Sequence, residues 1–267
     1  MSTPSAPVTC YIRTKNEERM IGPVIQAAKA AVDDVVIVDS GSTDATVKIA
    51  ASLGARVIQQ PWLGNGKQKR VGEDAALHDW VLDLDADEIV SPDLAALIRD
   101  LFAAGPPPFS VYQLDLVTVP PIGEPWHDVA VADRKKLYDK RIIRAPDHAA
   151  WDQFDIPQGM KVGRLRAPLY HHSFRDFEHF MSKLNRISTV RAHESKLKPL
   201  WVVALRIWLA PPFYFMKHFL ARDHWKLGLY GVAIAGMSAH GRWLRDIKML
   251  EIHLKRRQAE QKTPESG

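Results

Sequence analysis

The sequence is most informative about its fold at residues 35–44, which read VVIVDSGSTD. Four β-branched residues in a row are typical of a strand that is buried on both faces of a parallel sheet. The polar turn that follows ends in Asp44, which can cap a helix, and Gly54 is suited to end that helix. A strand followed at once by a helix is the repeating unit of parallel α/β sheets.

The same alternation continues on both sides of this stretch. The other predicted strands are residues 8–12, 56–58 and 80–84, and the other predicted helices are residues 17–32, 67–79 and 91–103. These units predict an α/β fold with a mostly parallel, Rossmann-like sheet flanked by helices. In such sheets the ligand binds beyond the carboxyl ends of the strands.

The composition is that of a folded protein. Of the 267 residues, 46% are hydrophobic and 25% are charged, so a packed core is expected and disorder is not. Cys10 is the single cysteine, which excludes an internal disulfide and fits a reducing compartment. Residues 1–7 have neither a basic n-region nor an apolar h-region, so no secretory signal is predicted.

Charge is distributed unevenly along the chain. Residues 1–160 hold 16 Lys and Arg against 23 Asp and Glu, whereas residues 161–257 hold 19 against 6. This asymmetry indicates an anionic partner for the second half, either nucleic acid or an acidic membrane surface. A solvated basic helical face would explain the charge as well.

The second half also changes in texture from about Arg175 onward. Long helical patterns appear there, rich in Trp, Phe, Leu and basic residues, and residues 197–219 are interrupted by Pro211-Pro212. The longest uncharged stretch, residues 227–241, is shorter than the roughly 18–20 residues that a membrane-spanning helix needs. The pattern favours an amphipathic helical extension that lies on a membrane surface, with a helical subdomain packed on the core as the alternative.

Three polar segments are expected at the carboxyl ends of strands. They are residues 13–17 (RTKNE), residues 38–44 (VDSGSTD) and residues 64–70 (GNGKQKR). Asp39 could bind a ribose hydroxyl or a base N–H, while hydroxyls, free backbone N–H groups and lysines favour a diphosphate. Each segment also has a plain structural explanation as a helix start, a capped turn or an exposed basic first turn.

The most specific segment is residues 83–88, which read DLDADE. Four carboxylates in six residues repel one another unless a cation or well-placed donors compensate. Hard divalent cations prefer oxygen ligands, and Mg²⁺ typically takes one or two carboxylates together with substrate phosphates. An Asp-x-Asp that directly follows a hydrophobic strand therefore indicates a metal–diphosphate site.

In order and spacing, residues 13–17, 38–44 and 84–88 resemble those of family 2 glycosyltransferases with the GT-A fold, in particular the lipopolysaccharide-core β-1,4-glucosyltransferase group. The resemblance is specific over residues 8–103 and continues more loosely through residues 141–144, 163–165, 169–173 and 183–188. It implies an inverting transfer of a sugar, a hexose from a UDP-sugar, to a saccharide or glycolipid acceptor in cell-envelope polysaccharide or lipopolysaccharide biosynthesis.

The resemblance also implies which residues bind the donor and the metal. The residues expected at the nucleotide-sugar are Arg13, Thr14, Asn16, Glu17, Asp39, Ser40, Gly41, Ser42, Lys67, Lys69 and Asp85. Asp85 and Asp87 match the Asp-x-Asp that binds donor and Mg²⁺ or Mn²⁺. His171 is a further candidate metal ligand, since imidazole suits Mn²⁺ better than Mg²⁺, although a structural histidine is the alternative.

The catalytic base is where the sequence departs from the family pattern. An inverting transfer needs a group that takes the proton from the acceptor hydroxyl. In the family this carboxylate often lies in a Val-His-Glu before Gly-Arg-Leu, whereas residues 149–155 here read AAWDQFD. Asp155 is the first candidate for the base and Asp152 the second.

The expected domains are a GT-A domain at residues 1–175, a helical membrane-surface or acceptor region at 176–257 and a polar tail at 258–267. The GT-A domain would divide into a nucleotide-sugar half at 8–105 and an acceptor half at 106–175. The expected location is cytoplasmic, on the inner face of the cytoplasmic membrane, with no nucleic-acid partner. Two other functions remain open, a nucleotidyltransferase on a related sheet and a non-catalytic membrane-surface or nucleic-acid-binding protein.

Overall fold

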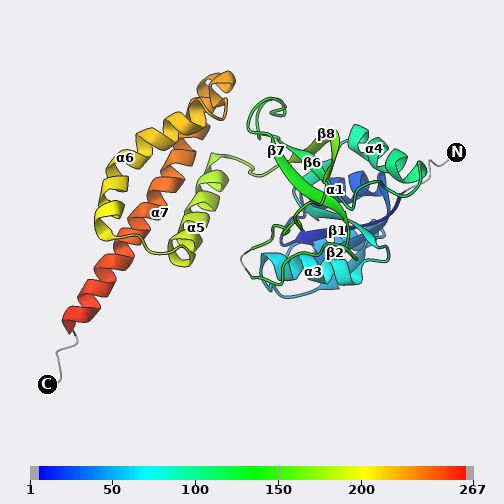
Figure 1. Ribbon diagram of the computed structural model, residues 1–267, viewed down its shortest axis with the longest axis horizontal. Coiled ribbons are helices and arrows are strands. Elements are labelled where there is room, and N and C mark those ends of the chain that lie inside the picture. Colours follow the sequence, from blue (N-terminus) through cyan, green and yellow to red (C-terminus); the bar gives the residue numbers. More distant parts are fainter. Residues whose placement is uncertain (1–5, 150, 263–267) are drawn as a thin grey trace. The chain divides into compact units, whose positions relative to one another are not determined.

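The computed structural model describes residues 6–149 and 151–262, which fall into two compact units (Figure 1). The first unit runs to Ser173, except that Pro120–Ile122 and Asp128–Ala130 group with the second. The second unit continues from Phe174. Each unit is described by itself.

Within the described residues, the first unit contains one eight-stranded sheet with the order β3-β2-β1-β4-β7-β6-β8-β5. The strands are β1 (Ala6–Thr14), β2 (Val32–Asp39), β3 (Arg56–Gln59), β4 (Trp80–Asp85), β5 (Glu88–Val90), β6 (Val111–Thr118), β7 (Ala132–Asp139) and β8 (Gly163–His171). The four strands β3-β2-β1-β4 are parallel, and so are β6 and β8. The pairs β4–β7, β6–β7 and β5–β8 are antiparallel.

Helices cover both faces of this sheet, as Figure 1 shows. They are α1 (Ile21–Lys29), α2 (Thr46–Ser52), α3 (Asn65–Ala75) and α4 (Pro92–Ala103). Because successive side chains of a strand point to opposite faces, Cys10 and Ile12 of β1 pack in the cluster formed with α1, α2 and α4. Tyr11 packs on the other face, in the cluster formed with α3.

Local sequence signals explain where several of these helices begin and end. The Ser91 side chain accepts a hydrogen bond from the Leu94 N–H and so caps α4 as predicted. Gly54 adopts the predicted left-handed conformation after α2, with φ at 69°. Helix α1 is shorter than the predicted 17–32, because residues 18–20 form a turn and β2 already begins at Val32.

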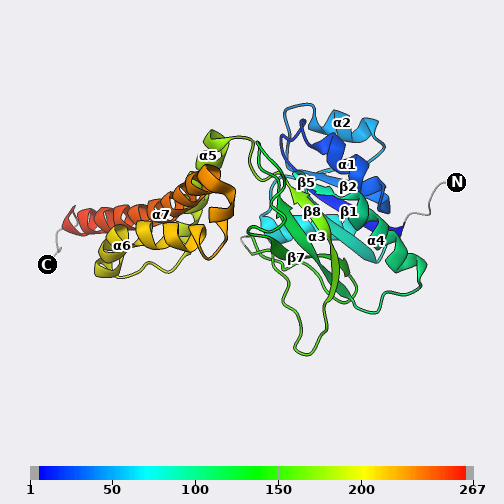
Figure 2. The same ribbon diagram turned by 90° about the horizontal axis from the view of Figure 1, so that it is seen from above.

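The second unit consists of long helices, which Figure 2 shows from above. They are α5 (Phe177–Glu194), α6 (Leu200–Phe219), the short 3₁₀ helix η1 (His224–Leu227) and α7 (Gly228–Lys262). Ala192, Val203 and Met249 form one buried cluster within it. The Lys248 ammonium group of α7 donates to the Asn185 carbonyl oxygen at 2.8 Å, which ties α7 to α5.

The predicted α/β fold, a mostly parallel sheet flanked by helices with a helical C-terminal extension, is confirmed. Among the described helices, none combines the length and the apolar character needed to cross a membrane.

Candidate active site

The polar segments predicted from the sequence meet at the carboxyl edge of the parallel strands. The strand registers pair Thr14 with Asp39 and Arg13 with Asp85. β4 ends at Asp85, one residue beyond the predicted strand at 80–84. This edge is where open α/β sheets bind ligands.

Two loops at this edge are tied together by hydrogen bonds. The Asn16 backbone N–H donates to Ser42 Oγ at 2.8 Å, and the Asn16 side-chain oxygen accepts from the Thr43 N–H at 2.8 Å. The Glu17 N–H donates to Thr46 Oγ1 at 2.8 Å. Asn16 and Glu17 therefore hold the two loops together, and their predicted contact with a nucleotide stays a prediction.

Asp39 is completely buried at the end of β2. Its Oδ2 atom accepts from the backbone N–H groups of Gly41 and Ser42, at 3.0 and 2.9 Å, and its Oδ1 atom accepts from the Ser42 hydroxyl. A carboxylate offers about four acceptor positions, so one remains for a further donor. No part of Asp39 is exposed in the described structure, so its predicted contact with a ribose or a base remains a prediction.

The glycines before α3 permit a close chain crossing. A Cβ on Gly64 would lie 2.3 Å from the Ala149 Cα atom, and one on Gly66 would lie 2.1 Å from the Pro146 carbonyl oxygen. Here the Asn65 N–H donates to the Ala149 carbonyl oxygen at 2.6 Å. The glycine-rich segment thus holds the start of α3 against residues 146–149, a contact that the sequence did not predict.

The lysines of this segment differ in their surroundings. Lys67 is exposed and forms a long ion pair with Asp147, at 3.9 Å. Lys69 is buried, and its ammonium group lies 2.7 Å from Asp83 Oδ2 and 3.2 Å from Asp152 Oδ2. Lys69 is therefore the lysine of the pair that reaches the pocket at the end of the sheet.

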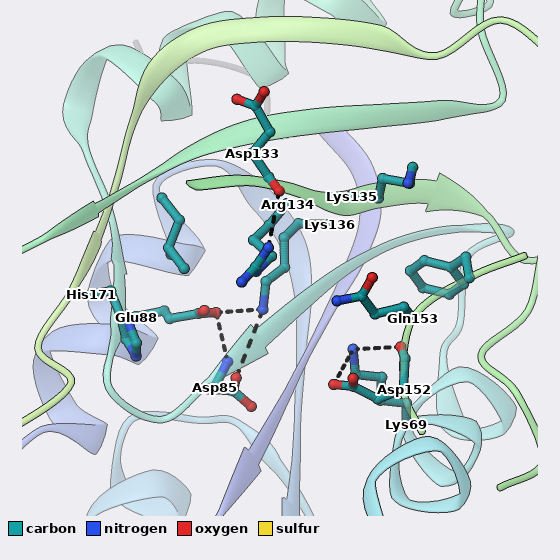
Figure 3. Close-up of a pocket in the computed structure, with 12 residues that line it drawn as sticks. Lys69, Asp85, Glu88, Asp133, Arg134, Lys135, Lys136, Asp152, Gln153 and His171 are labelled. Atoms are coloured by element: carbon teal, nitrogen blue, oxygen red, sulfur yellow. Dashed lines mark hydrogen bonds and ion pairs between the residues drawn. The ribbon is translucent and has the colours of Figure 1, made fainter. Parts of the chain in front are cut away.

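This pocket is lined by side chains from both halves of the sheet (Figure 3). The lining residues are Lys69, Asp85, Glu88, Leu116, Asp133, Arg134, Lys135, Lys136, Asp152, Gln153, Phe154 and His171. Of the residues predicted from the sequence, it brings together Lys69, Asp85, Asp152 and His171. Asp155 is exposed and is not part of the lining.

Lys136 of β7 is the main pocket residue that the sequence did not identify. It is buried, and its ammonium group lies 2.8 Å from Glu88 Oε2 and 3.9 Å from Asp85 Oδ2 (Figure 3). Glu88 Oε2 also accepts from the Asp85 backbone N–H at 2.9 Å. The basic run at residues 134–136 was the available signal, but a run of charges more often lies on a solvated surface.

Buried cations compensate the negative charge of Asp83 and Asp85. Partial burial by itself would raise the pKa of Asp85, but Arg13, Lys136 and Lys69 outweigh it and hold that pKa well below its usual range. For Asp83 the same balance of burial against Lys69 and Lys136 also lowers the pKa. Both carboxylates are therefore ionised at neutral pH.

Removal of the Lys136 charge should destabilise the fold. Lys136→Met would leave Glu88 and Asp83 buried without this cation, and breaking a buried ion pair from one side costs about 3–5 kcal/mol. For a protein of this size we expect Tm to fall by roughly 6–20 °C. Thermal unfolding of Lys136→Met measures this effect. Lys135→Met is the control, because Lys135 is only partly buried and forms no ion pair within the described residues. Equal Tm values for the two variants would contradict the structural role.

Asp87 and His171 are the pair best suited to a divalent metal. His171 Nε2 lies 3.4 Å from Asp87 Oδ2, and both side chains are partly exposed. Among the described residues, no three acidic, histidine or cysteine side chains are grouped as a complete metal site. Mg²⁺ and similar ions commonly take one or two protein ligands and complete their shell with substrate phosphates. The donor set therefore fits a metal that is shared with a diphosphate.

Asp85 differs from Asp87 in its contacts. One of its oxygens is paired with the Arg13 guanidinium, yet 41% of the Asp85 side chain is exposed, so it remains accessible to a donor or to a metal. The Arg13 side chain itself is mostly buried. Its predicted contact with the nucleotide-sugar stays a prediction.

Comparison with known proteins gives a consistent family. The family model described as Glycosyl transferase family 2 matches residues 9–167. An uncharacterised glycosyltransferase of Rickettsia felis is 31% identical, over 93% of this chain and 91% of its own length. The lipopolysaccharide core biosynthesis glycosyltransferase LpsC of Rhizobium meliloti is 28% identical, over 94% of each chain.

Among solved structures, residues 1–349 of TarS from S. aureus match with a TM-score of 0.47 and 16% identity, over 94% of this chain and 91% of that one. The family assignment rests on the sequence matches, because the family model covers more than half of the chain. This assignment favours a glycosyltransferase over the nucleotidyltransferase and the non-catalytic binding protein considered above. The chain belongs to glycosyl transferase family 2.

Proposed function

We propose that this protein transfers a hexose from a UDP-sugar to a saccharide or glycolipid acceptor, with inversion at the anomeric carbon and with the help of Mn²⁺ or Mg²⁺. The observation that carries the proposal is the grouping of Asp85, His171, Lys69 and Asp152 around one pocket at the carboxyl edge of the sheet. Similarity to LpsC, whose name places it in lipopolysaccharide core biosynthesis, supports an acceptor of the cell envelope.

On the donor side, the loops at Asn16 and Ser42 would receive the nucleoside, with Asp39 accepting a hydrogen bond from it. Asp87 and His171 would hold the metal, and Asp85 would bind beside them. A divalent metal supplies positive charge that stabilises the departing diphosphate. Lys69 lies beside Asp152 and Asp83, where it keeps the pocket from accumulating uncompensated negative charge.

On the acceptor side, Asp152 is the carboxylate that the pocket favours as the base. Its Oδ2 atom would take the proton from the acceptor hydroxyl as the hydroxyl oxygen bonds to the anomeric carbon. The bond from that carbon to the diphosphate breaks in the same step, so UDP leaves from the opposite face. Asp155 would have to reach the pocket from an exposed position outside the lining.

The surroundings of the reaction are part of the proposal. A glycolipid acceptor would be met at the inner face of the cytoplasmic membrane, and the basic second unit is suited to an anionic lipid surface. Residues 174–262 hold 17 Lys and Arg against 7 Asp and Glu. We therefore propose peripheral association with that membrane.

A donor screen tests the activity. We expect the full chain to release UDP slowly from one UDP-sugar in the presence of Mn²⁺ or Mg²⁺, and to lose this hydrolysis in excess EDTA. Sugars carried by other nucleoside diphosphates serve as comparison donors. Release of pyrophosphate from a nucleoside triphosphate and a sugar phosphate, without turnover of any nucleotide-sugar, would instead indicate a nucleotidyltransferase.

A further inference from the structure

Helix α6 exposes a continuous row of large apolar side chains. We call this row the α6 apolar face, and it consists of Trp201, Leu205, Trp208, Leu209, Phe213, Met216 and Leu220. The spacings of three and four residues place these side chains on one side of the helix. Trp201 and Trp208 are 71% and 81% exposed, which is unusual for the largest apolar side chain.

This face is not the one that holds the helical unit together. The buried residues of α6 are Val203 and Ala210, and Val203 belongs to the core cluster formed with Ala192 and Met249. Helix α6 therefore has two apolar sides. One packs within the unit, and the α6 apolar face is exposed in the structure.

Unpaired positive charge lies at the C-terminal end of this face. Arg206 is the one charged residue in the first half of α6, and its guanidinium group is paired with the buried Asp246 at 3.1 Å. Lys217 and Arg222 are exposed at the far end of the helix and form no ion pair within the described residues. The next turn adds the exposed Trp225.

These features select one occupant for the face. A second copy of the chain would bring another unit of strong positive charge against the first, and like charges oppose such pairing. An anionic lipid surface attracts the same charge. Tryptophan is also the side chain most favoured at a membrane–water interface, where its ring lies among the headgroups.

We propose that the α6 apolar face is the membrane-docking surface of this protein, inserted at the headgroup level of an anionic bilayer with Lys217 and Arg222 paired to lipid phosphates. Helix α6 then lies in the plane of the interface, as amphipathic helices with aromatic and basic residues do. The docking would bring the enzyme to a glycolipid acceptor, and in this respect the inference rests on the proposed function.

Vesicle binding by the full chain tests the docking surface. We expect binding to vesicles of equimolar phosphatidylcholine and phosphatidylglycerol, and much weaker binding to phosphatidylcholine alone. The double variant Trp208→Ser/Leu209→Ser should lower the partition coefficient roughly tenfold or more, because two large apolar contacts are lost. Leu77→Ser is the matched control, since Leu77 is 70% exposed between α3 and β4, outside the helical unit.

The charge contribution is tested separately. Lys217→Glu/Arg222→Glu should weaken binding to the anionic vesicles at physiological salt, where the screening length is about 8 Å, and should matter little at 1 M salt, where it is about 3 Å. Sedimentation of the free protein records its oligomeric state. Equal vesicle binding by wild type and Trp208→Ser/Leu209→Ser would overturn the proposal, and so would a wild-type dimer that this variant abolishes.

These results are separable from the proposed activity. UDP release from the donor without vesicles should be the same in the Trp208→Ser/Leu209→Ser variant as in wild type. If the wild-type chain binds anionic vesicles through α6 but turns over no nucleotide-sugar, the proposed function fails and the docking surface stands. If turnover is present and vesicle binding is absent, the docking surface fails alone.

Discussion

Asp87→Ala should lower kcat/KM for sugar transfer by about 1,000-fold, or roughly 4 kcal/mol of transition-state stabilisation. The physical reason is that Asp87 and His171 are the pair that would hold the metal against the leaving diphosphate. The fold should tolerate the change, because the Asp87 side chain is partly exposed and its one ion pair in the described structure is with His171. Steady-state kinetics and thermal unfolding of the same preparation measure both effects.

The matched control for this variant is Asp100→Ala. Asp100 is an exposed aspartate of α4 and does not line the pocket. It should keep both wild-type activity and wild-type Tm. Full activity in Asp87→Ala would remove the metal-ligand role, and a loss of activity that merely follows a large fall in Tm would show that Asp87 acts through the fold.

Asp152→Asn should lower kcat by about 100- to 10,000-fold while leaving KM for the donor nearly unchanged. An amide keeps the size of the side chain but cannot accept the acceptor proton. The Lys69–Asp83 ion pair at 2.7 Å remains, so the buried lysine keeps a partner and the fold should survive. Initial rates at varied donor and acceptor concentrations separate the two constants.

The corresponding variant Asp155→Asn distinguishes the two candidates for the base. Asp155 is exposed and does not line the pocket, so this variant should keep activity within a fewfold of wild type. The opposite pattern, with Asp155→Asn inactive and Asp152→Asn active, would assign the base to Asp155. In that case residues 151–155 would have to rearrange when the acceptor binds.

The parallel half of the sheet could be predicted because its signals are local. The β-branched run at 35–38 forms part of β2, and Ser91 with Pro92 marks the start of α4. The Asp-x-Asp was equally visible, since its first aspartate, Asp85, ends the hydrophobic strand β4. Each of these inferences uses residues that are neighbours in the chain.

The rest depends on contacts between distant segments. Lys136 reaches the carboxylates at the end of β4 because β7 pairs with β4 in antiparallel orientation, and neither β7 nor that pairing has a strong local signal. The proposal that Asp152 rather than Asp155 is the base likewise rests on tertiary structure, since Lys69 pairs with Asp152 at the pocket. Spacing along the chain carries no information about such pairings.

Titration of UDP into the full chain, with Mn²⁺ and again with excess EDTA, tests the central claim most directly. We expect Mn²⁺ to tighten UDP binding roughly tenfold or more, in the range of typical coupling between two bound ligands. Asp87→Ala should bind UDP with the same affinity in both conditions, because the coupling passes through the metal. Wild-type affinity for UDP that is unchanged by Mn²⁺, or no measurable UDP binding at all, would contradict the account.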